Sequence, residues 1–346
     1  MNLENLRNWQ IPPGWLRITT FDAHSEGEPL RIVTGGFPDL PGQSILERRR
    51  YLKEHLDHFR TMLMWEPRGH REMYGCILTP PVSPAADVGV LFMHNEGYST
   101  MCGHGIIALT TVAVQSGLVP KHEPETVVRI ETPAGLITGH ARVKGDHIES
   151  AYFENVPSFA VTLDESVEVK GFGRVKYDLS FGGAFYAYVD ARQLNLTCSA
   201  SESPRLVETG MAIKRAVMTS REIVHPFERD LGFLYGTIFI APPLSQGADY
   251  RNVCIFADGQ VDRSPTGTGV SGLMAILHAR GEVEVGQPKV VESIIGSRFT
   301  GRIVGTTTFG EYAAVIPQVE GRAFVMGRHE FVIDPKDPLG HGFLLE

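Results

Sequence analysis

The chain reads Met101-Cys102-Gly103-His104-Gly105-Ile106-Ile107-Ala108-Leu109 at one point and Pro265-Thr266-Gly267-Thr268-Gly269-Val270-Ser271-Gly272-Leu273 at another, and these two stretches decide the fold. In each, two glycines open an apolar segment with helical spacing. A further glycine ends the segment 15 residues after Cys102 in the first stretch and 15 residues after Thr266 in the second. The equal spacing predicts two halves of one architecture, related by duplication.

The rest of the chain predicts more strands than helices. Helical patterns cover residues 44–62, 103–115, 204–217 and 269–280, and strand patterns cover 30–34, 88–93, 127–132, 185–190, 237–241, 253–257 and 302–304. Because the helices are few and isolated, the pattern favours an α/β (α+β) fold with curled mixed sheets over a doubly wound fold.

Composition narrows the class of protein. The chain has 346 residues, 42% of them hydrophobic and 21% charged, which predicts a globular protein of two domains. Its formal net charge of -8 argues against a nucleic-acid surface or a polybasic membrane anchor. The four cysteines, at positions 76, 102, 198 and 254, are too sparse for a disulfide framework and too scattered for a zinc knuckle, so no metal site is predicted.

The first residues, MNLENLRNWQIPPGW, have no basic region followed by an apolar one, so no signal peptide is predicted. No apolar stretch reaches the roughly 18 residues that a transmembrane helix needs. We therefore expect a cytoplasmic protein.

The two glycine-rich stretches suit the binding of an anion. Glycines let the backbone approach a ligand closely, and the first amides of a helix attract a carboxylate or phosphate. The same position favours a thiolate at Cys102, but by only about 0.3–1 kcal/mol when exposed, so a further activating feature is needed. The alternative is a plain strand-to-helix turn in which Cys102 is a small buried hydrophobe. Residues 267–272 also spell G-x-G-x-x-G, a weak nucleotide signal because the preceding strand pattern ends near residue 257.

Four segments resemble the proline racemase family, in the family's order. They are FDAHSEGEPLRIV at 21–33, MCGHG at 101–105, SFGGAFYAYVD at 180–190 and DRSPTGTG at 262–269. The resemblance implies a diaminopimelate-epimerase-like fold of two pseudo-symmetric halves, residues 1–160 with 324–346 returning to them, and residues 161–323. It also implies a proline-type substrate in the cleft between the halves, no metal or organic cofactor, and a monomer or homodimer.

One residue departs from the racemase pattern. Racemases and epimerases of the family have a cysteine in both motifs, whereas this chain has Cys102 in the first and Thr266 in the second. A hydroxyl is a far weaker acid than a thiol, so proton exchange on both faces of the ring is not expected. The pairing resembles the branch that dehydrates trans-3-hydroxy-L-proline. In that substrate the Cα hydrogen and the C3 hydroxyl share a face, so Cys102 would remove the proton, water would leave, and Thr266 would line the pocket.

The resemblance also assigns substrate-binding residues. Gly103 and His104 would bind through backbone amides, with the His104 side chain near the substrate or the leaving water, and Gly267 and Thr268 would do the same in the second half. Asp262 would bind the ring amine, as a carboxylate naturally does. Its alternative role is an Asx turn or an acid at a helix start.

Weaker candidates have both a structural and a functional interpretation. His24, Glu26 and Glu28 either brace the fold or serve the site, His94 either packs or reaches the cleft, and Phe181, Phe185 and Tyr186 either pack the core or wall the ring pocket. Cys76, Cys198 and Cys254 are predicted to be buried small hydrophobes.

Two other functions stay open from the sequence. One is a proline racemase or 4-hydroxyproline 2-epimerase that tolerates Thr266. The other is a catalytically silent protein that binds a proline-type amino acid, which the thiol of Cys102 argues against.

Overall fold

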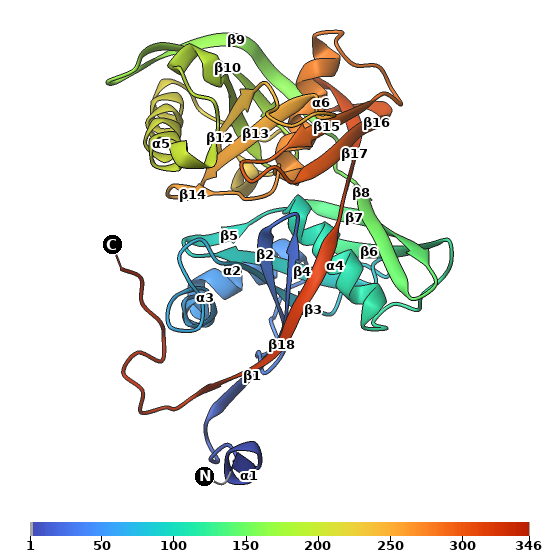
Figure 1. Ribbon diagram of the computed structural model, residues 1–346, viewed down its shortest axis with the longest axis vertical. Helices are drawn as coiled ribbons and strands as arrows, with labels where there is room; N and C mark the ends of the chain where they lie inside the picture. The colour runs from blue at the N-terminus through green and yellow to red at the C-terminus, as the bar shows by residue number, and fades with distance from the viewer. Residues whose placement is uncertain (1–2, 346) are drawn as a thin grey trace.

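The structure, a computed structural model, describes residues 3–345 and has two lobes (Figure 1). The first lobe contains β1 (Leu16–Ser25), β2 (Glu28–Gly35), α2 (Ile45–His55), α3 (Asp57–Met64), β3 (Tyr74–Thr79), β4 (Val88–His94), β5 (Gly97–Ser99), α4 (Gly103–Gln115), β6 (Glu125–Thr132), β7 (Gly135–Lys144), β8 (His147–Glu154) and β18 (Ala323–Ile333). The second contains β9 (Phe159–Val169), β10 (Gly173–Phe181), β11 (Phe185–Asp190), α5 (Ser203–Ser220), β12 (Leu234–Ala241), β13 (Tyr250–Phe256), β14 (Gln260–Val261), α6 (Gly267–Ala279), β15 (Pro288–Glu292), β16 (Arg298–Phe309) and β17 (Tyr312–Gly321).

The two lobes have the same strand order. Hydrogen bonds join β18-β1-β2-β3-β4-β6-β7-β8 in the first lobe. They join β9-β10-β11-β12-β13-β15-β16-β17 in the second. The parallel pairs also correspond, since β2–β3 and β4–β6 match β11–β12 and β13–β15. This equivalence confirms the predicted α/β fold of pseudo-symmetric halves with curled mixed sheets.

Each sheet curls around one apolar helix. In the first lobe α4 packs against β1, β2, β7, β8 and β18, and in the second α6 packs against β9, β10, β16 and β17. Nearly every residue of both helices is buried, as expected for helices that are apolar on all sides. Both end as the sequence predicts, at Gly117 and Gly281, whose φ angles of 75° and 72° suit glycine.

The helix predicted over residues 44–62 is two helices, which corrects that prediction. The chain turns at Leu56, between α2 and α3. Only Ile45 and Leu52 of α2 are buried, whereas α3 buries six consecutive residues, 59–64. A single straight helix could not lie on the surface along one half and be enclosed along the other, so the break follows from packing.

The chain crosses between the lobes twice, after β8 and after β17 (Figure 1). The end of β17 pairs with β8, from Gln318 opposite Glu154 to Gly321 opposite Ala151, which joins the two sheets. Strand β18 then pairs with the whole length of β1, so the chain returns to the first lobe, and its last residues reach α3, where Phe343 bridges to Glu66. The domain boundaries at 160/161 and 323/324 stay predictions.

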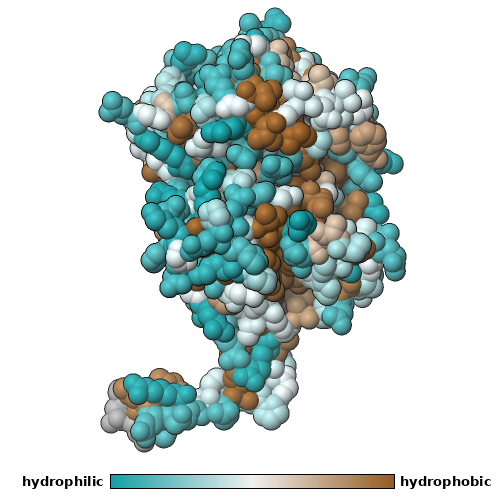
Figure 2. Space-filling view, turned by 90° about the vertical axis from the view of Figure 1, so that its right-hand side faces the viewer, coloured by the Kyte–Doolittle hydropathy of each residue, from teal (hydrophilic) through white to brown (hydrophobic). Residues whose placement is uncertain are grey.

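The N-terminal segment contains a short helix, α1 (Leu3–Arg7), none of whose residues is buried. Figure 2 shows this segment projecting from the body of the molecule, whose surface on that face is mostly hydrophilic with apolar patches. Within residues 3–345, no helix is long and apolar enough to cross a membrane.

A buried ion pair joins β13 to β15 in the second lobe, and it predicts the effect of replacing Glu292 by Gln. Arg251 Nη2 lies 3.1 Å from Glu292 Oε1, and both side chains are almost fully buried. Burial alone would raise the pKa of Glu292, but hydrogen bonds from Arg251, Ser245 and the Leu244 amide outweigh it and lower the pKa to about 2. Glu292→Gln leaves Arg251 buried without its counter-charge, so we expect a loss of about 3–5 kcal/mol in the free energy of unfolding at pH 7.

Urea unfolding at several pH values measures this loss. The ionised carboxylate stabilises the fold above the usual pKa of 4.5 and stops doing so as the pH falls toward 2, so the difference between wild type and variant should shrink over that range. Arg192→Gln, which removes an exposed ion pair with Asp190, is the control and should cost less than about 1 kcal/mol. Equal losses in the two variants would contradict the prediction.

Candidate active site

The first motif places a thiol at the start of α4. Cys102 is the N-cap residue, and its sulfur accepts a hydrogen bond from the amide of Gly105 at 3.3 Å. The His104 ring lies against the same sulfur, with Nδ1 3.1 Å away. The helix start alone favours the thiolate only weakly. The imidazole of His104, which can accept the thiol proton, is the further activating feature that this thiol needs.

The second motif places a threonine hydroxyl at the start of α6. Thr266 is the N-cap residue and has a φ angle of 66°, a conformation that costs energy for a β-branched side chain. Its hydroxyl donates a hydrogen bond to Asp262 Oδ2 at 2.8 Å. Asp262 Oδ1 accepts from the amide of Ser264 at 2.8 Å, so Asp262 does form the Asx turn that the sequence left as an alternative.

The starts of the two helices touch through their glycines. A Cβ atom on Gly103 would lie 2.5 Å from the Cα of Gly267, and one on Gly267 would lie 2.6 Å from the Cα of Gly103. Real Cβ atoms do not approach backbone so closely, so only glycine fits at either position. The two sets of unpaired helix amides are therefore brought to one place.

All seven residues that the sequence predicted for the site line one narrow cavity between the lobes. They are Cys102, Gly103 and His104 from the first lobe, and Asp262, Thr266, Gly267 and Thr268 from the second. The cavity has a volume of about 20 Å³, room for about one water molecule, so the lobes are closed and must part to admit a ligand.

Burial sets the protonation of the two groups that share the first wall. It raises the pKa of the Cys102 thiol well above its usual value, and the Gly105 amide and the Tyr74 hydroxyl only partly oppose this. Burial also lowers the pKa of His104 to about 4, although Asp262 acts in the other direction. At neutral pH the pair therefore rests as a thiol and a neutral imidazole, with the imidazole able to accept a proton.

The aromatic candidates divide between the cavity and the core. Tyr186 lines the cavity, and its hydroxyl lies 2.8 Å from the Thr268 hydroxyl. Phe181 and Phe185 pack instead in the second lobe's core beneath α5, which is the structural one of their two interpretations. His94 is buried against Tyr74 and packs rather than reaching the cavity.

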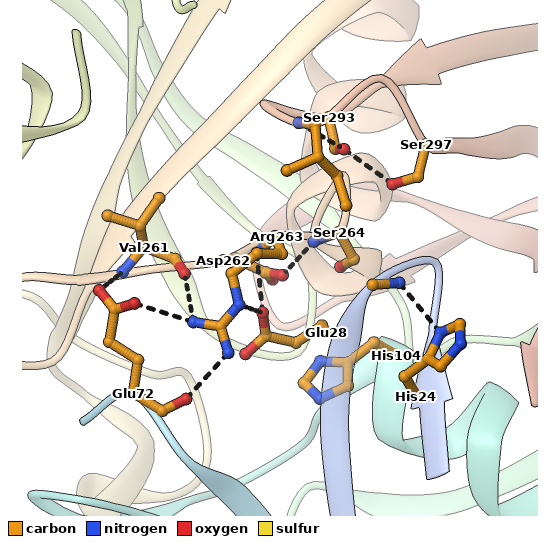
Figure 3. Close-up of polar contacts among 12 residues, drawn as sticks. His24, Glu28, Glu72, His104, Val261, Asp262, Arg263, Ser264, Ser293 and Ser297 are labelled. Carbon is orange, nitrogen blue, oxygen red and sulfur yellow. Dashed lines mark hydrogen bonds and ion pairs between the residues drawn. The ribbon is translucent and has the colours of Figure 1, made fainter. Parts of the chain in front are cut away.

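The turn between β1 and β2 braces the fold, which is one of the two interpretations that the sequence left open for it. His24 Nδ1 accepts a hydrogen bond from the Gly27 amide at 3.2 Å, and Glu26 pairs with Arg322 at 3.1 Å. Glu28 lies 3.0 Å from Arg263, the residue next to Asp262 (Figure 3).

Several residues of the cavity were not predicted for it. They are Tyr74, Met101, Tyr235, Cys254 and Phe256. Cys254 is buried, as expected, but it also lines the cavity, and burial and the Asp262 carboxylate raise the pKa of its thiol well above the usual value, which Thr266 only partly opposes. One feature of the sequence could have indicated that Cys254 lines the cavity. Cys254 lies a short distance before Asp262 along the chain, and a glycine turn separates the two.

The part of the chain that the structure describes contains no group of three or more His, Cys, Asp or Glu side chains able to hold a metal ion.

Comparison with known proteins agrees with these motifs. Residues 20–344 match the family model described as proline racemase. A Bacillus cereus protein named trans-3-hydroxy-L-proline dehydratase is 47% identical over 327 residues, covering 94% of this chain and 98% of its own. A Burkholderia multivorans protein named 3-hydroxyproline 2-epimerase is 46% identical over 328 residues, covering 95% and 98%. A crystal structure of a hydroxyproline epimerase from Agrobacterium vitis, with bound trans-4-hydroxy-L-proline, matches with a TM-score of 0.91 at 36% identity, covering 96% of each chain.

The raised pKa of Cys102 predicts how its alkylation depends on pH. Because only the thiolate reacts, the rate with iodoacetamide should still be rising steeply about one pH unit above the usual thiol pKa of 9.0, where an ordinary thiol is almost fully ionised and its rate levels off. The measurement is mass spectrometry of the peptide that contains residue 102, with Cys102→Ala as the blank. A rate that is already constant at pH 7 would show a thiolate at rest and would contradict the prediction.

Proposed function

The chain belongs to the proline racemase family, and we propose that it is a hydro-lyase that converts trans-3-hydroxy-L-proline to Δ1-pyrroline-2-carboxylate. The observation that supports this most directly is the asymmetry of the cavity walls. At the start of the first helix is a thiol beside an imidazole, and at the start of the second is a hydroxyl already hydrogen-bonded to Asp262.

The substrate lies between the two helix starts in this proposal. Its carboxylate accepts hydrogen bonds from the unpaired amides of Gly103, His104, Gly267 and Thr268, and its ring ammonium binds to Asp262. These contacts turn the ring face that bears both the Cα hydrogen and the C3 hydroxyl toward Cys102.

The reaction then needs only the Cys102–His104 pair. His104 takes the proton of the Cys102 thiol, and the thiolate removes the Cα proton, so the sulfur is protonated again. The electron pair of the former C–H bond forms the double bond between Cα and C3, and the C3–O bond breaks. The imidazolium protonates the leaving hydroxide to give water, which returns both side chains to their starting forms. The enamine then tautomerises to the imine.

The pKa directions suit each role. A buried thiol with a raised pKa gives a strongly basic thiolate, and a buried imidazolium with a pKa of about 4 is a strong acid toward hydroxide. Inversion at Cα would need a comparably placed acid on the opposite wall. The Thr266 hydroxyl, which donates to Asp262, is not such an acid, and this favours dehydration over racemisation.

The direct test is to incubate the purified protein with trans-3-hydroxy-L-proline and follow the pyrroline product by NMR. We expect turnover in the wild type and a loss of at least about 10³-fold in kcat for Cys102→Ser, because a serine hydroxyl is a far weaker acid than a thiol. The comparison substrates are L-proline and trans-4-hydroxy-L-proline. Their inversion at Cα, with no loss of water from the 3-hydroxy compound, would overturn the proposal in favour of an epimerase.

A second variant tests the role of His104 as the acid. His104→Gln should lower kcat for trans-3-hydroxy-L-proline by about 10²–10⁴-fold, the usual contribution of a general acid. Fluoride leaves without being protonated, so on trans-3-fluoro-L-proline the same variant loses only the help of His104 in ionising Cys102, and its loss of activity, measured as fluoride release, should be smaller. Equal losses on both substrates would assign His104 to activation of Cys102 alone.

A further inference from the structure

The segment that carries Asp262 belongs to the second lobe but is held by side chains of the first. The Val261 amide donates to Glu72 Oε1 at 3.1 Å, and the Arg263 amide donates to Glu28 Oε2 at 2.7 Å. Both neighbours of Asp262 are therefore anchored across the gap between the lobes (Figure 3). One residue further back, Gln260 Nε2 donates to Asn95 Oδ1 at 3.0 Å, which is also in the first lobe.

The side chain of Arg263 makes most of this connection. Its Nε lies 3.0 Å from Glu28 Oε2, its Nη1 lies 2.9 Å from Glu72 Oε2, and its Nη2 donates to the backbone oxygen of Glu72 at 3.1 Å. Figure 3 shows the guanidinium group between the two glutamates. A planar guanidinium with several fixed donors is suited to holding two partners at set angles, which a lysine could not do.

Two features of the partners are costly and suggest a function beyond packing. Glu72 adopts a φ angle of 66°, which is unfavourable for a residue with a side chain. Glu28 is completely buried, and its Oε1 atom has no hydrogen-bond partner among the described residues. Burial and the nearby Asp262 carboxylate raise the pKa of Glu28 well above its usual value, and Arg263 only partly opposes this, so a second positive charge beside these acidic groups is favoured.

We propose that Arg263, clamped by Glu28 and Glu72, is a positioning residue that sets the carboxylate of Asp262 for the substrate's ring ammonium. The ammonium site is then complete only when the lobes are closed, because its carboxylate comes from one lobe and its alignment from the other. This inference rests on the proposed function for the identity of the ligand.

The competing explanation is that Arg263 simply holds the lobes together. The structure offers a matched control for it, because Arg50 Nε in α2 lies 2.7 Å from Asp230 Oδ2 of the second lobe, away from Asp262 in the sequence and outside the cavity. If Arg263 only holds the lobes together, Arg50→Gln and Arg263→Gln should have the same effect on ligand binding. A positioning role predicts that only changes around Arg263 affect binding of the amine.

The experiment compares two ring ligands by calorimetry. L-Proline has the ring ammonium and no C3 hydroxyl to lose, and tetrahydrofuran-2-carboxylate has the same carboxylate but a ring oxygen without N–H donors. Arg263→Gln should weaken L-proline binding by about tenfold or more, the value of a charge-assisted hydrogen bond, and tetrahydrofuran-2-carboxylate binding by less than about threefold. Arg50→Gln should change neither.

A second variant distinguishes a loss of ligand binding from a folding defect. Arg263→Gln leaves Glu28 buried without a counter-charge, whereas Glu72→Gln removes the other side of the clamp at a partly exposed residue and should keep the melting temperature. The same selective loss of L-proline binding is expected in Glu72→Gln.

Equal weakening of both ligands, or an equal effect of Arg50→Gln, would overturn the positioning role. Failure of the proposed function would look different. In that case the wild type would bind L-proline but leave trans-3-hydroxy-L-proline unchanged, and the comparison of the two ligands would still decide what Arg263 does.

Discussion

The meeting of two helix starts is the constraint on which the structure depends. Gly103 and Gly267 touch backbone to backbone, so the partly positive ends of α4 and α6 face one another in a region from which water is largely excluded. Like partial charges held so close favour an anion between them. A carboxylate satisfies both ends at once, and its binding and the closing of the lobes then reinforce each other. The strands serve mainly to hold the two helices in this head-to-head position.

Much of this arrangement could be predicted from local sequence. The helix at 103–115 and the strand at 185–190 were predicted with the bounds that the structure has. The seven residues predicted for the site line one cavity, because they cluster in two motifs at helix starts. Strands that are half exposed were missed. In β18 several apolar positions face solvent, as Phe324 and Met326 do, so alternation of apolar and polar residues does not mark this strand.

What the sequence could not predict depends on contacts between residues far apart in the chain. Tyr74 and Tyr235 reach the cavity from different lobes, and no local pattern distinguishes them from core tyrosines. The pairing of Arg263 with Glu28 and Glu72 spans up to 235 positions of the sequence. The protonation of Cys102 and His104 is likewise set by burial, which only the closed structure defines. The motifs therefore indicate the candidate groups, and the fold determines their environment.

The identical strand order of the two lobes has a consequence for how such enzymes diversify. Each lobe encloses its own helix within its own sheet, so the residue that precedes one helix can change without disturbing the other wall. A ligand bound between the lobes contacts one surface from each lobe, and the two surfaces can acquire substitutions independently. Under the proposed function, the chemistry on one face of the substrate ring can thus be changed by a single substitution, while the carboxylate site that both helix starts form is kept.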